Sequence, residues 1–296
     1  NNYFKNFSLK PDEIIISDGG STDQTQTIVE SYQKDTRIIF FRRKGRCRGS
    51  GRNEGISLAK NSLVALIDSG IVPEKNWLAE LYLSHKDSNK EVVYGAVRPV
   101  ISSSVTRALG AFIVGKLPGG DSIFPSVGSM LVTKESWEKV GKFKESLTGE
   151  YVVEDLDFIS KIDNSEIGTV INKQALSHWE IAQDFKEIFL RFSNYSQGTL
   201  ENGLFKTWHL GTLRNTLIYT FLILLGAFLG LIAFFLLAFF HLARAISYLI
   251  NTKWFIDANN TEKAKDLLYL CLVLIVIDLA TYNGVARAVR RFFKQT

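Results

Sequence analysis

The sequence has few cysteines, which excludes proteins held together by disulfide bonds or by cysteine-bound zinc. Cys47 and Cys271 are the only cysteines in 296 residues, and their wide separation rules out a disulfide framework and a cysteine-based zinc cluster. The chain also lacks low-complexity segments and internal repeats. Hydrophobic residues make up 46% and charged residues 22% of the chain, which excludes disordered and fibrous proteins. We expect a folded protein in a reducing compartment.

Charge is missing from one long stretch near the C-terminal end. Between Asn215 and Leu242 there is no Asp, Glu, Lys or Arg, whereas about 20 apolar residues suffice for a helix to cross a bilayer. A second stretch, Leu267 to Ala286, contains a single charged residue, Asp278. Asp278 is either a functional group in an apolar helix or a residue near the membrane boundary. Both stretches lie too far from the N-terminus to be a signal peptide.

These stretches predict a division of the chain into a folded front domain and a membrane region. We expect the domain over residues 1–205 and the membrane region over residues 206–296. The region would contain two transmembrane helices, at about 215–240 and 267–286. An alternative divides residues 213–250 into two short helices, which would give three spans.

Basic residues flank both apolar stretches and indicate an orientation. The positive-inside rule favours a two-helix hairpin that leaves the front domain and the C-terminus in the cytoplasm, so we expect a multi-pass membrane protein. The three-span alternative turns near Gly226 and Gly230 and places the tail outside. In a third interpretation, part of residues 243–255 forms an amphipathic helix that lies along the membrane interface. The flanking basic residues are Arg191, Lys206 and Arg214 before the first stretch and Arg287, Arg290, Arg291 and Lys294 after the second.

Strands and helices alternate in the first 200 residues. This pattern predicts an α/β domain, with a mostly parallel sheet covered by helices on both faces. Ligands bind such sheets outside the carboxyl ends of the strands, where we expect Asp18 and Asp68. One such Asp is ordinarily a helix cap, but two of them with glycine-rich turns favour a site. The expected strands are 13–17, 37–41, 63–68, 92–97, 127–132 and 169–171. One expected helix starts at Ser21 or Thr22, and three others cover 51–60, 77–85 and 134–140.

Five ordered segments between about residues 12 and 200 point to a family. They are IIISDGGSTDQT, RGSGRNEGISLAK, LIDSGIVPEKNWL, FPSVGSMLVTKESWEKVGKF and VVEDLDF. In order and spacing they resemble the family-2 glycosyltransferases, which are inverting enzymes with the GT-A fold. The resemblance implies a GT-A nucleotide-sugar-binding domain with hexosyltransferase-like activity. Asn1 to Lys10 is similar to the end of the family's first helix, so we expect an N-terminally truncated sequence without the first strand.

The resemblance also implies roles for individual residues. Asp155 would be the general base with Glu154 beside it, because adjacent carboxylates can raise the pKa of one of them. Without the resemblance, these acids would form an ordinary acidic first turn of a helix. Glycines allow close approach of the backbone to the donor, and a guanidinium can pair with phosphate. The implied donor-binding residues are Asp18, Gly19, Gly20, Asp23, Arg52, Asn53 and Asp68.

A divalent cation, Mg²⁺ or Mn²⁺, is the cofactor that the resemblance implies. Asp68 and His178 would be its ligands, although His178 could instead contact the diphosphate or lie at the edge of the core. The family usually has Asp-x-Asp at the third strand end, and the second Asp is the usual metal ligand. Here Gly70 replaces that residue, so the mode of metal binding departs from the family pattern.

The expected function follows from the resemblance and the apolar tail. The Gln-x-x-Arg-Trp signature of processive synthases is absent, so we expect transfer of one sugar at a time. The donor would be a nucleotide-diphosphate sugar, and the acceptor a lipid-linked or cell-surface glycan in cell envelope polysaccharide biosynthesis. The alternative is a catalytically degenerate nucleotide-sugar-binding or scaffolding membrane protein. The net charge is +5 and the pI about 9.0, but the basic residues cluster around apolar helices, so no nucleic-acid partner is expected.

Overall fold

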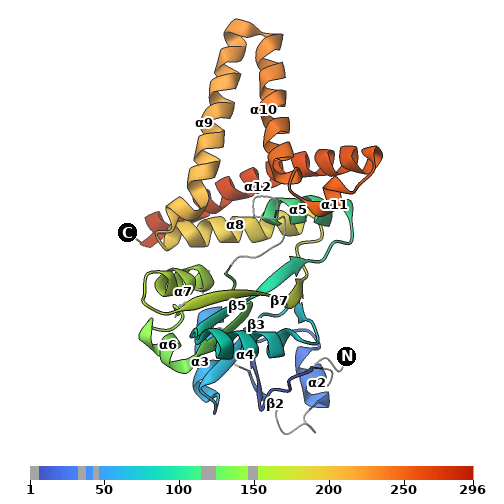
Figure 1. Ribbon diagram of the computed structural model, residues 1–296. Coiled ribbons are helices and arrows are strands. Elements are labelled where there is room, and N and C mark those ends of the chain that lie inside the picture. The colour runs from blue at the N-terminus through green and yellow to red at the C-terminus, as the bar shows by residue number, and fades with distance from the viewer. Residues whose placement is uncertain (1–6, 33–37, 43–46, 115–124, 146–152, 296) are drawn as a thin grey trace. The chain divides into compact units, whose positions relative to one another are not determined.

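The structure is a computed structural model that describes residues 7–32, 38–42, 47–114, 125–145 and 153–295 (Figure 1). The chain forms two compact units. Unit 1 comprises Asn1–Arg98 and Ile123–Trp179, and unit 2 comprises Pro99–Ser122 and Glu180–Thr296. The predicted functional division at residue 205 stays a prediction.

Unit 1 is an α/β domain with two sheets. Strands β1 and β2 pair in parallel, and a second sheet has the order β3-β6-β5-β7-β4. The strands are β1 (Ile14–Asp18), β2 (Ile38–Arg42), β3 (Leu63–Ile67), β4 (Ile71–Pro73), β5 (Val92–Pro99), β6 (Ser129–Thr133) and β7 (Thr169–Trp179). The helices are α2 (Thr25–Ser31), α3 (Arg48–Leu58), α4 (Trp77–Ser88), α6 (Lys134–Lys139) and α7 (Glu154–Asp163).

The prediction of a mostly parallel sheet is wrong, because the five-stranded sheet contains antiparallel pairs. Strand β6 runs antiparallel to both β3 and β5, and β4 runs antiparallel to β7. A parallel neighbour requires a crossover, usually a helix, that returns the chain to the same end of the sheet. In the described part of the chain, the helix between β5 and β6 is α5 (Ser104–Val114), which belongs to unit 2, so no crossover helix of unit 1 stands between these two strands.

Helices cover both faces of the five-stranded sheet, as predicted. Successive side chains of a strand point to opposite faces of the sheet. On β5, Tyr94 packs with α3, α6 and α7 on one face, whereas its neighbour Val93 packs with α4 on the other. Trp137 of α6 and Trp77 of α4 are the large buried side chains on the two sides. The two resulting hydrophobic cores fix the sheet between its helices and thereby fix the strand ends.

The helix after β1 begins at Thr25, later than the predicted start at Ser21 or Thr22. The backbone N–H of Ser21 donates to both carboxylate oxygens of Asp18 at 3.1 Å. This turn holds the chain out of helical geometry, so the prediction was wrong by about one helical turn.

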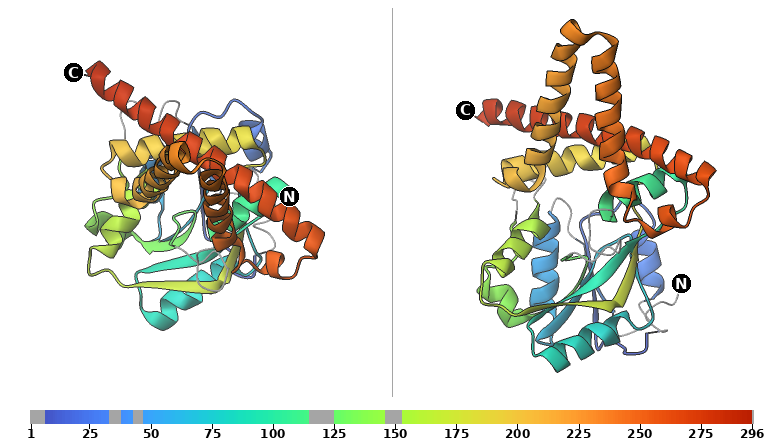
Figure 2. Two further views of the ribbon diagram at one scale, coloured as in Figure 1. Left: turned by 90° about the horizontal axis from the view of Figure 1, so that it is seen from above. Right: turned by 45° about the horizontal axis from the view of Figure 1, so that its top comes forward.

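Unit 2 consists of helices. They are α5 (Ser104–Val114), α8 (Phe185–Glu201), α9 (Phe205–Leu229), α10 (Leu231–Leu249), α11 (Lys253–Ile256) and α12 (Asn260–Gln295). Helix α12 packs along α8, where the Ser196 hydroxyl donates to the Thr281 carbonyl oxygen at 2.8 Å. Arg107 of α5 donates to both carboxylate oxygens of Asp266 of α12, at 2.8 and 2.7 Å. Helices α9 and α10 form a hairpin that projects from this layer (Figures 1 and 2).

The predicted continuous helix over 215–240 is wrong, because the chain turns at Gly230. This glycine has φ +52° and ψ −124°, a combination that residues with a side chain rarely adopt. The break coincides with the glycine named by the alternative interpretation. In the described part of the chain, α10 and α12 are the two helices that length and composition qualify to cross a membrane. Such helices weakly suggest membrane association.

Candidate functional site

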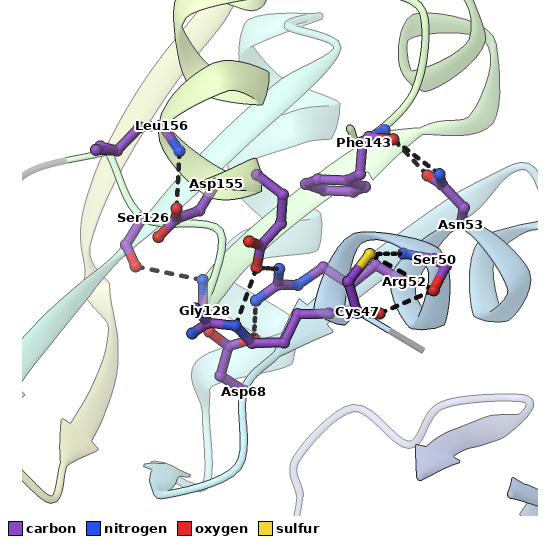
Figure 3. A network of polar contacts seen from close by, with 12 residues as sticks. Cys47, Ser50, Arg52, Asn53, Asp68, Ser126, Gly128, Phe143, Asp155 and Leu156 are labelled. Carbon is purple, nitrogen blue, oxygen red and sulfur yellow. Dashed lines mark hydrogen bonds and ion pairs between the residues drawn. The ribbon is translucent and has the colours of Figure 1, made fainter. Parts of the chain in front are cut away.

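Three charged side chains meet where α3, the start of α7 and the end of β3 come together. Arg52 of α3 donates from one terminal nitrogen to Glu154 Oε1 at 2.7 Å. Its other terminal nitrogen donates to Asp68 Oδ1 at 2.6 Å (Figure 3). Arg52 therefore bridges two acids that lie far apart in the sequence.

Burial differs sharply among these three side chains. The exposed fraction is 2% for Glu154, 12% for Arg52 and 40% for Asp68. Burial alone would lower the pKa of Arg52, but the neighbouring Asp68 and Glu154 carboxylates raise it above its ordinary value. The guanidinium thus stays charged. It neutralises Glu154 inside the domain while holding Asp68 at the surface.

Two further residues complete the surroundings of Arg52. Arg48 Nε lies 3.3 Å from Glu154 Oε1, and the Arg52 guanidinium carbon lies 5.5 Å from the centre of the Phe143 ring. The sequence prediction missed both. Arg48 stands four positions before Arg52, so the two share one face of a helix, and this spacing was the available signal. Phe143 offered no signal, because only tertiary structure brings it to α3.

Asp68 lies against the backbone of Gly128, another residue that the sequence prediction missed. A Cβ atom at Gly128 would stand 3.1 Å from Asp68 Oδ2 and 2.6 Å from Ile71 Cδ1. The Gly128 N–H donates to Ser126 Oγ at 3.2 Å. The missing side chain therefore leaves room for the Asp68 carboxylate beside the loop that precedes β6.

Glu154 and Asp155 are adjacent in the sequence but have different surroundings. Glu154 is buried against Arg52, whereas Asp155 is half-buried. Asp155 Oδ1 accepts a hydrogen bond from the Leu156 N–H at 2.9 Å, and its side chain lies on the side of Ser126 (Figure 3). Asp155 is thus the member of the pair with access to solvent.

Asp18 forms a separate group at the end of β1. Besides Ser21, its carboxylate contacts Arg42, whose Nε lies 3.2 Å from Oδ2. Burial would raise the pKa of Asp18, but hydrogen bonds from Ser21 and Gly20 and the charge of Arg42 together lower it. Gly20 has φ +106° and so allows the chain to fold back onto the carboxylate. Gly19, which follows Asp18 directly, is exposed.

Asn53 and Asp23 make local contacts. The Asn53 amide donates to the Phe143 carbonyl at 2.9 Å and to Glu145 at 2.7 Å, and its oxygen accepts from Trp137 Nε1 and the Phe143 N–H, both at 3.0 Å. Asp23 accepts from the Thr25 N–H at 3.0 Å. These contacts favour structural roles, and the predicted donor-binding roles stay predictions.

The predicted metal ligands are not assembled into a group. His178 Nε2 lies 3.1 Å from Glu74 Oε1, and Asp68 Oδ1 is engaged by Arg52. Among the residues that the structure describes, no three His, Cys, Asp or Glu side chains gather where they could hold a metal ion. This donor set does not fit the implied cation.

Comparisons with known proteins match the chain to one family model and to several glycosyltransferases. The family model described as "Glycosyl transferase family 2" matches residues 3–143. The chain is 34% identical over 80 residues to "Validoxylamine A glucosyltransferase" of Streptomyces hygroscopicus subsp. jinggangensis (strain 5008), covering 26% of this chain and 19% of that protein. It is 32% identical over 84 residues to "Uncharacterized glycosyltransferase YfnE" of Bacillus subtilis (strain 168), covering 28% and 21%. The chain thus spans about a fifth of the length of these relatives.

A solved structure also resembles the chain. It is S. aureus TarS 1–349 in complex with UDP-GlcNAc, with 14% sequence identity and a TM-score of 0.49. The match covers 92% of this chain and 84% of the TarS chain.

Proposed function

Because the chain carries a glycosyl transferase family 2 domain, we propose that it moves a single sugar from a nucleotide-diphosphate sugar to an acceptor hydroxyl, with inversion. The observation that carries this proposal is the contrast between Glu154 and Asp155. One acid is neutralised by Arg52 inside the domain, and the next has access to solvent. A solvent-accessible carboxylate in the first turn of a helix is suited to act as a general base.

In the proposed reaction, Asp155 accepts the proton of the acceptor hydroxyl. The acceptor oxygen forms a bond to the anomeric carbon while the bond from that carbon to the diphosphate oxygen breaks. Attack from the face opposite the leaving group inverts the anomeric centre. Glu154 acts through Arg52 and is therefore a positioning residue in this scheme.

The donor would lie near the strand ends that hold Asp18 and Asp68. Each carboxylate is fixed by cations and hydrogen bonds, Asp18 by Arg42 and Ser21 and Asp68 by Arg52. Fixed carboxylates can accept hydrogen bonds from ribose or base without reorganisation. Since the two terminal nitrogens of Arg52 are engaged by Asp68 and Glu154, we assign Arg52 to positioning Asp68 rather than to direct phosphate contact.

The acceptor class rests on unit 2. Its two long apolar helices support a membrane-associated protein and hence a lipid-linked or cell-surface glycan acceptor. We place the catalytic domain in the cytoplasm, since nucleotide sugars would reach the site there and the C-terminus is rich in Arg and Lys.

The test compares two variants with the wild-type protein, each as the full chain in detergent or nanodiscs. Asp155→Asn should lower nucleoside diphosphate release by about 10²–10⁴-fold, the usual contribution of a general base, while donor binding is retained. Asp157→Asn is the matched control, because Asp157 lies in the same helical turn and pairs with Lys161 at 2.8 Å. We expect it to keep near-normal turnover. Undiminished turnover in Asp155→Asn would refute the base assignment.

The donor screen distinguishes the alternative function. UDP-, GDP- and dTDP-sugars would be offered with a crude lipid extract, with and without Mg²⁺ or Mn²⁺. Release from one donor establishes transfer and tests the predicted cation requirement. Nucleotide-sugar binding without release from any donor would favour the catalytically degenerate binding protein.

A further inference from the structure

We propose that the α9–α10 hairpin inserts into one leaflet of a lipid bilayer, turning inside the membrane at Gly230, and does not cross it. The inference concerns unit 2 alone and does not depend on the proposed reaction. It replaces the two predicted spans with a single re-entrant insertion.

The hairpin exposes large apolar side chains around its whole circumference. Phe228 beside the turn is 86% exposed. Adjacent positions such as Phe234 and Phe235 are both exposed, although neighbours on a helix point about 100° apart. A protein partner would cover one face, whereas lipid surrounds a helix that is apolar on all sides. The large apolar side chains of the hairpin that are at least 60% exposed are Leu217, Phe221, Ile223, Leu224, Phe228, Leu231, Ile232, Phe234, Phe235 and Phe239.

The length of the apolar part matches one leaflet. Tyr219 and His241 each stand eleven positions from Gly230, a distance of about 16 Å at 1.5 Å per helical residue. The hydrocarbon core of a bilayer is about 30 Å thick, and a crossing helix needs about 20 residues. Each arm therefore reaches roughly to the middle of the membrane.

Polar contacts between helices mark the base of the hairpin. A hydrogen bond of 2.7 Å joins the Tyr219 hydroxyl to His241 Nδ1, and His241 Nε2 lies 3.1 Å from the Cys271 carbonyl oxygen. One turn further along, Arg244 donates to both carboxylate oxygens of Asp278, one of them at 2.9 Å. Groups of this kind are costly in hydrocarbon, so we place this level at the headgroups. Asp278 is thereby assigned to the membrane boundary.

Helix α12 lies across the base of the hairpin (Figures 1 and 2). One of its faces is buried, with Leu270, Leu274 and Ile277. Another carries an exposed apolar stripe of Leu268, Leu272, Ile275, Leu279 and Tyr282, spaced three or four residues apart. A helix with such a stripe lies in the interface rather than across it. The exposed basic residues Arg287 and Arg290 near its C-terminal end suit anionic headgroups.

The two modes of insertion differ in which residues reach the far side. A hairpin that crosses the membrane presents Phe228 to the opposite compartment. A crossing α12 separates Asp257, before its start, from Lys294 near its end. In the one-leaflet arrangement, Asp257 and Lys294 lie on the same side of the membrane. A water-soluble reagent then reaches Phe228 from neither side.

Single-cysteine labelling of the full chain in sealed vesicles of known orientation tests these differences. Cys47→Ser and Cys271→Ala provide the background, and Phe228→Cys, Asp257→Cys and Lys294→Cys are the three probes. With a membrane-impermeant maleimide, we expect Asp257→Cys and Lys294→Cys to be labelled from the same side. Phe228→Cys should be labelled only after detergent is added. Labelling of Phe228→Cys from the far side, or of the other two from opposite sides, would overturn the proposal.

A second measurement separates lipid from a protein partner. A bimane label on Phe228→Cys is reconstituted with purified protein into phosphatidylcholine–phosphatidylglycerol vesicles that contain brominated lipids. One-leaflet insertion predicts strongest quenching by bromines near the bilayer centre. Absence of quenching at every bromine depth would show that lipid does not surround the tip and would also overturn the proposal.

Discussion

The buried Glu154 carboxylate predicts a large and asymmetric effect on stability. Arg52→Met removes the cation but keeps a side chain of similar length, so Glu154 loses its closest partner while remaining 2% exposed. Breaking a buried ion pair by removing one partner costs about 3–5 kcal/mol. We expect about 3 kcal/mol, because Arg48 stays 3.3 Å from Glu154.

The matched control changes the other acid that Arg52 contacts. Asp68 is 40% exposed, and exposed ion pairs contribute about 0–1 kcal/mol. Asp68→Asn should therefore cost less than about 1 kcal/mol. Thermal unfolding followed by circular dichroism measures both variants. At about 2–4 °C per kcal/mol for a unit of this size, Arg52→Met should lower the Tm by about 6–12 °C. Hydrogen exchange of peptides from α3 and α7 then shows whether the loss of stability lies in unit 1.

A third variant separates lost charge pairing from lost packing. Glu154→Leu in the Arg52→Met background removes the uncompensated charge, so it should recover much of the lost stability. Without recovery, the cost would come from the contact of Arg52 with Phe143. Equal Tm losses for Arg52→Met and Asp68→Asn would refute the reasoning as a whole.

Two further predictions concern Asn53, beside this cluster, and Asp18, at the end of β1. Asn53→Ala leaves the buried Trp137 Nε1–H and Phe143 N–H without their acceptor. Each unsatisfied donor costs about 1–3 kcal/mol, so urea unfolding should show a loss of about 2–6 kcal/mol, and an unchanged midpoint would contradict this role. Because the pKa of Asp18 is lowered, its stabilisation is present above the unfolded-state pKa and is lost as the pH falls through the folded-state pKa. Urea unfolding between about pH 5 and about pH 3 should therefore show a steeper loss for the wild type than for Asp18→Asn, and parallel curves would exclude a contribution from Asp18.

Local sequence signals located most elements of unit 1 but not their pairing. The strand predicted at 63–68 and the helix predicted at 77–85 appear as β3 and α4 with small shifts, because apolar patterns are local. Strand β6 pairs antiparallel with β3 and β5, which are distant from it in the sequence. No pattern within the strand encodes the direction of its neighbours, so alternation of strands and helices gave the wrong sheet type.

The site shows the same division between local and tertiary information. Arg52, Asp68 and Glu154 were each singled out from the sequence, but their contacts join positions 16 and 102 residues apart. Asn53 resembled a ligand-binding residue because it follows Arg52 in a shared motif. Its four hydrogen bonds inside the domain depend on residues that only the fold brings near.

Glu154 and Asp155 show how one dipeptide can serve two purposes. Consecutive residues at a helix start point about 100° apart, so a rigid α7 cannot direct both carboxylates at the same partner. Burial of Glu154 against Arg52 fixes the rotation of the helix about its axis. That rotation sets the direction of Asp155, on the side of Ser126 (Figure 3). The ion pair in the interior therefore determines where the proposed base is aimed, which ties the stability of the cluster to the chemistry of the site.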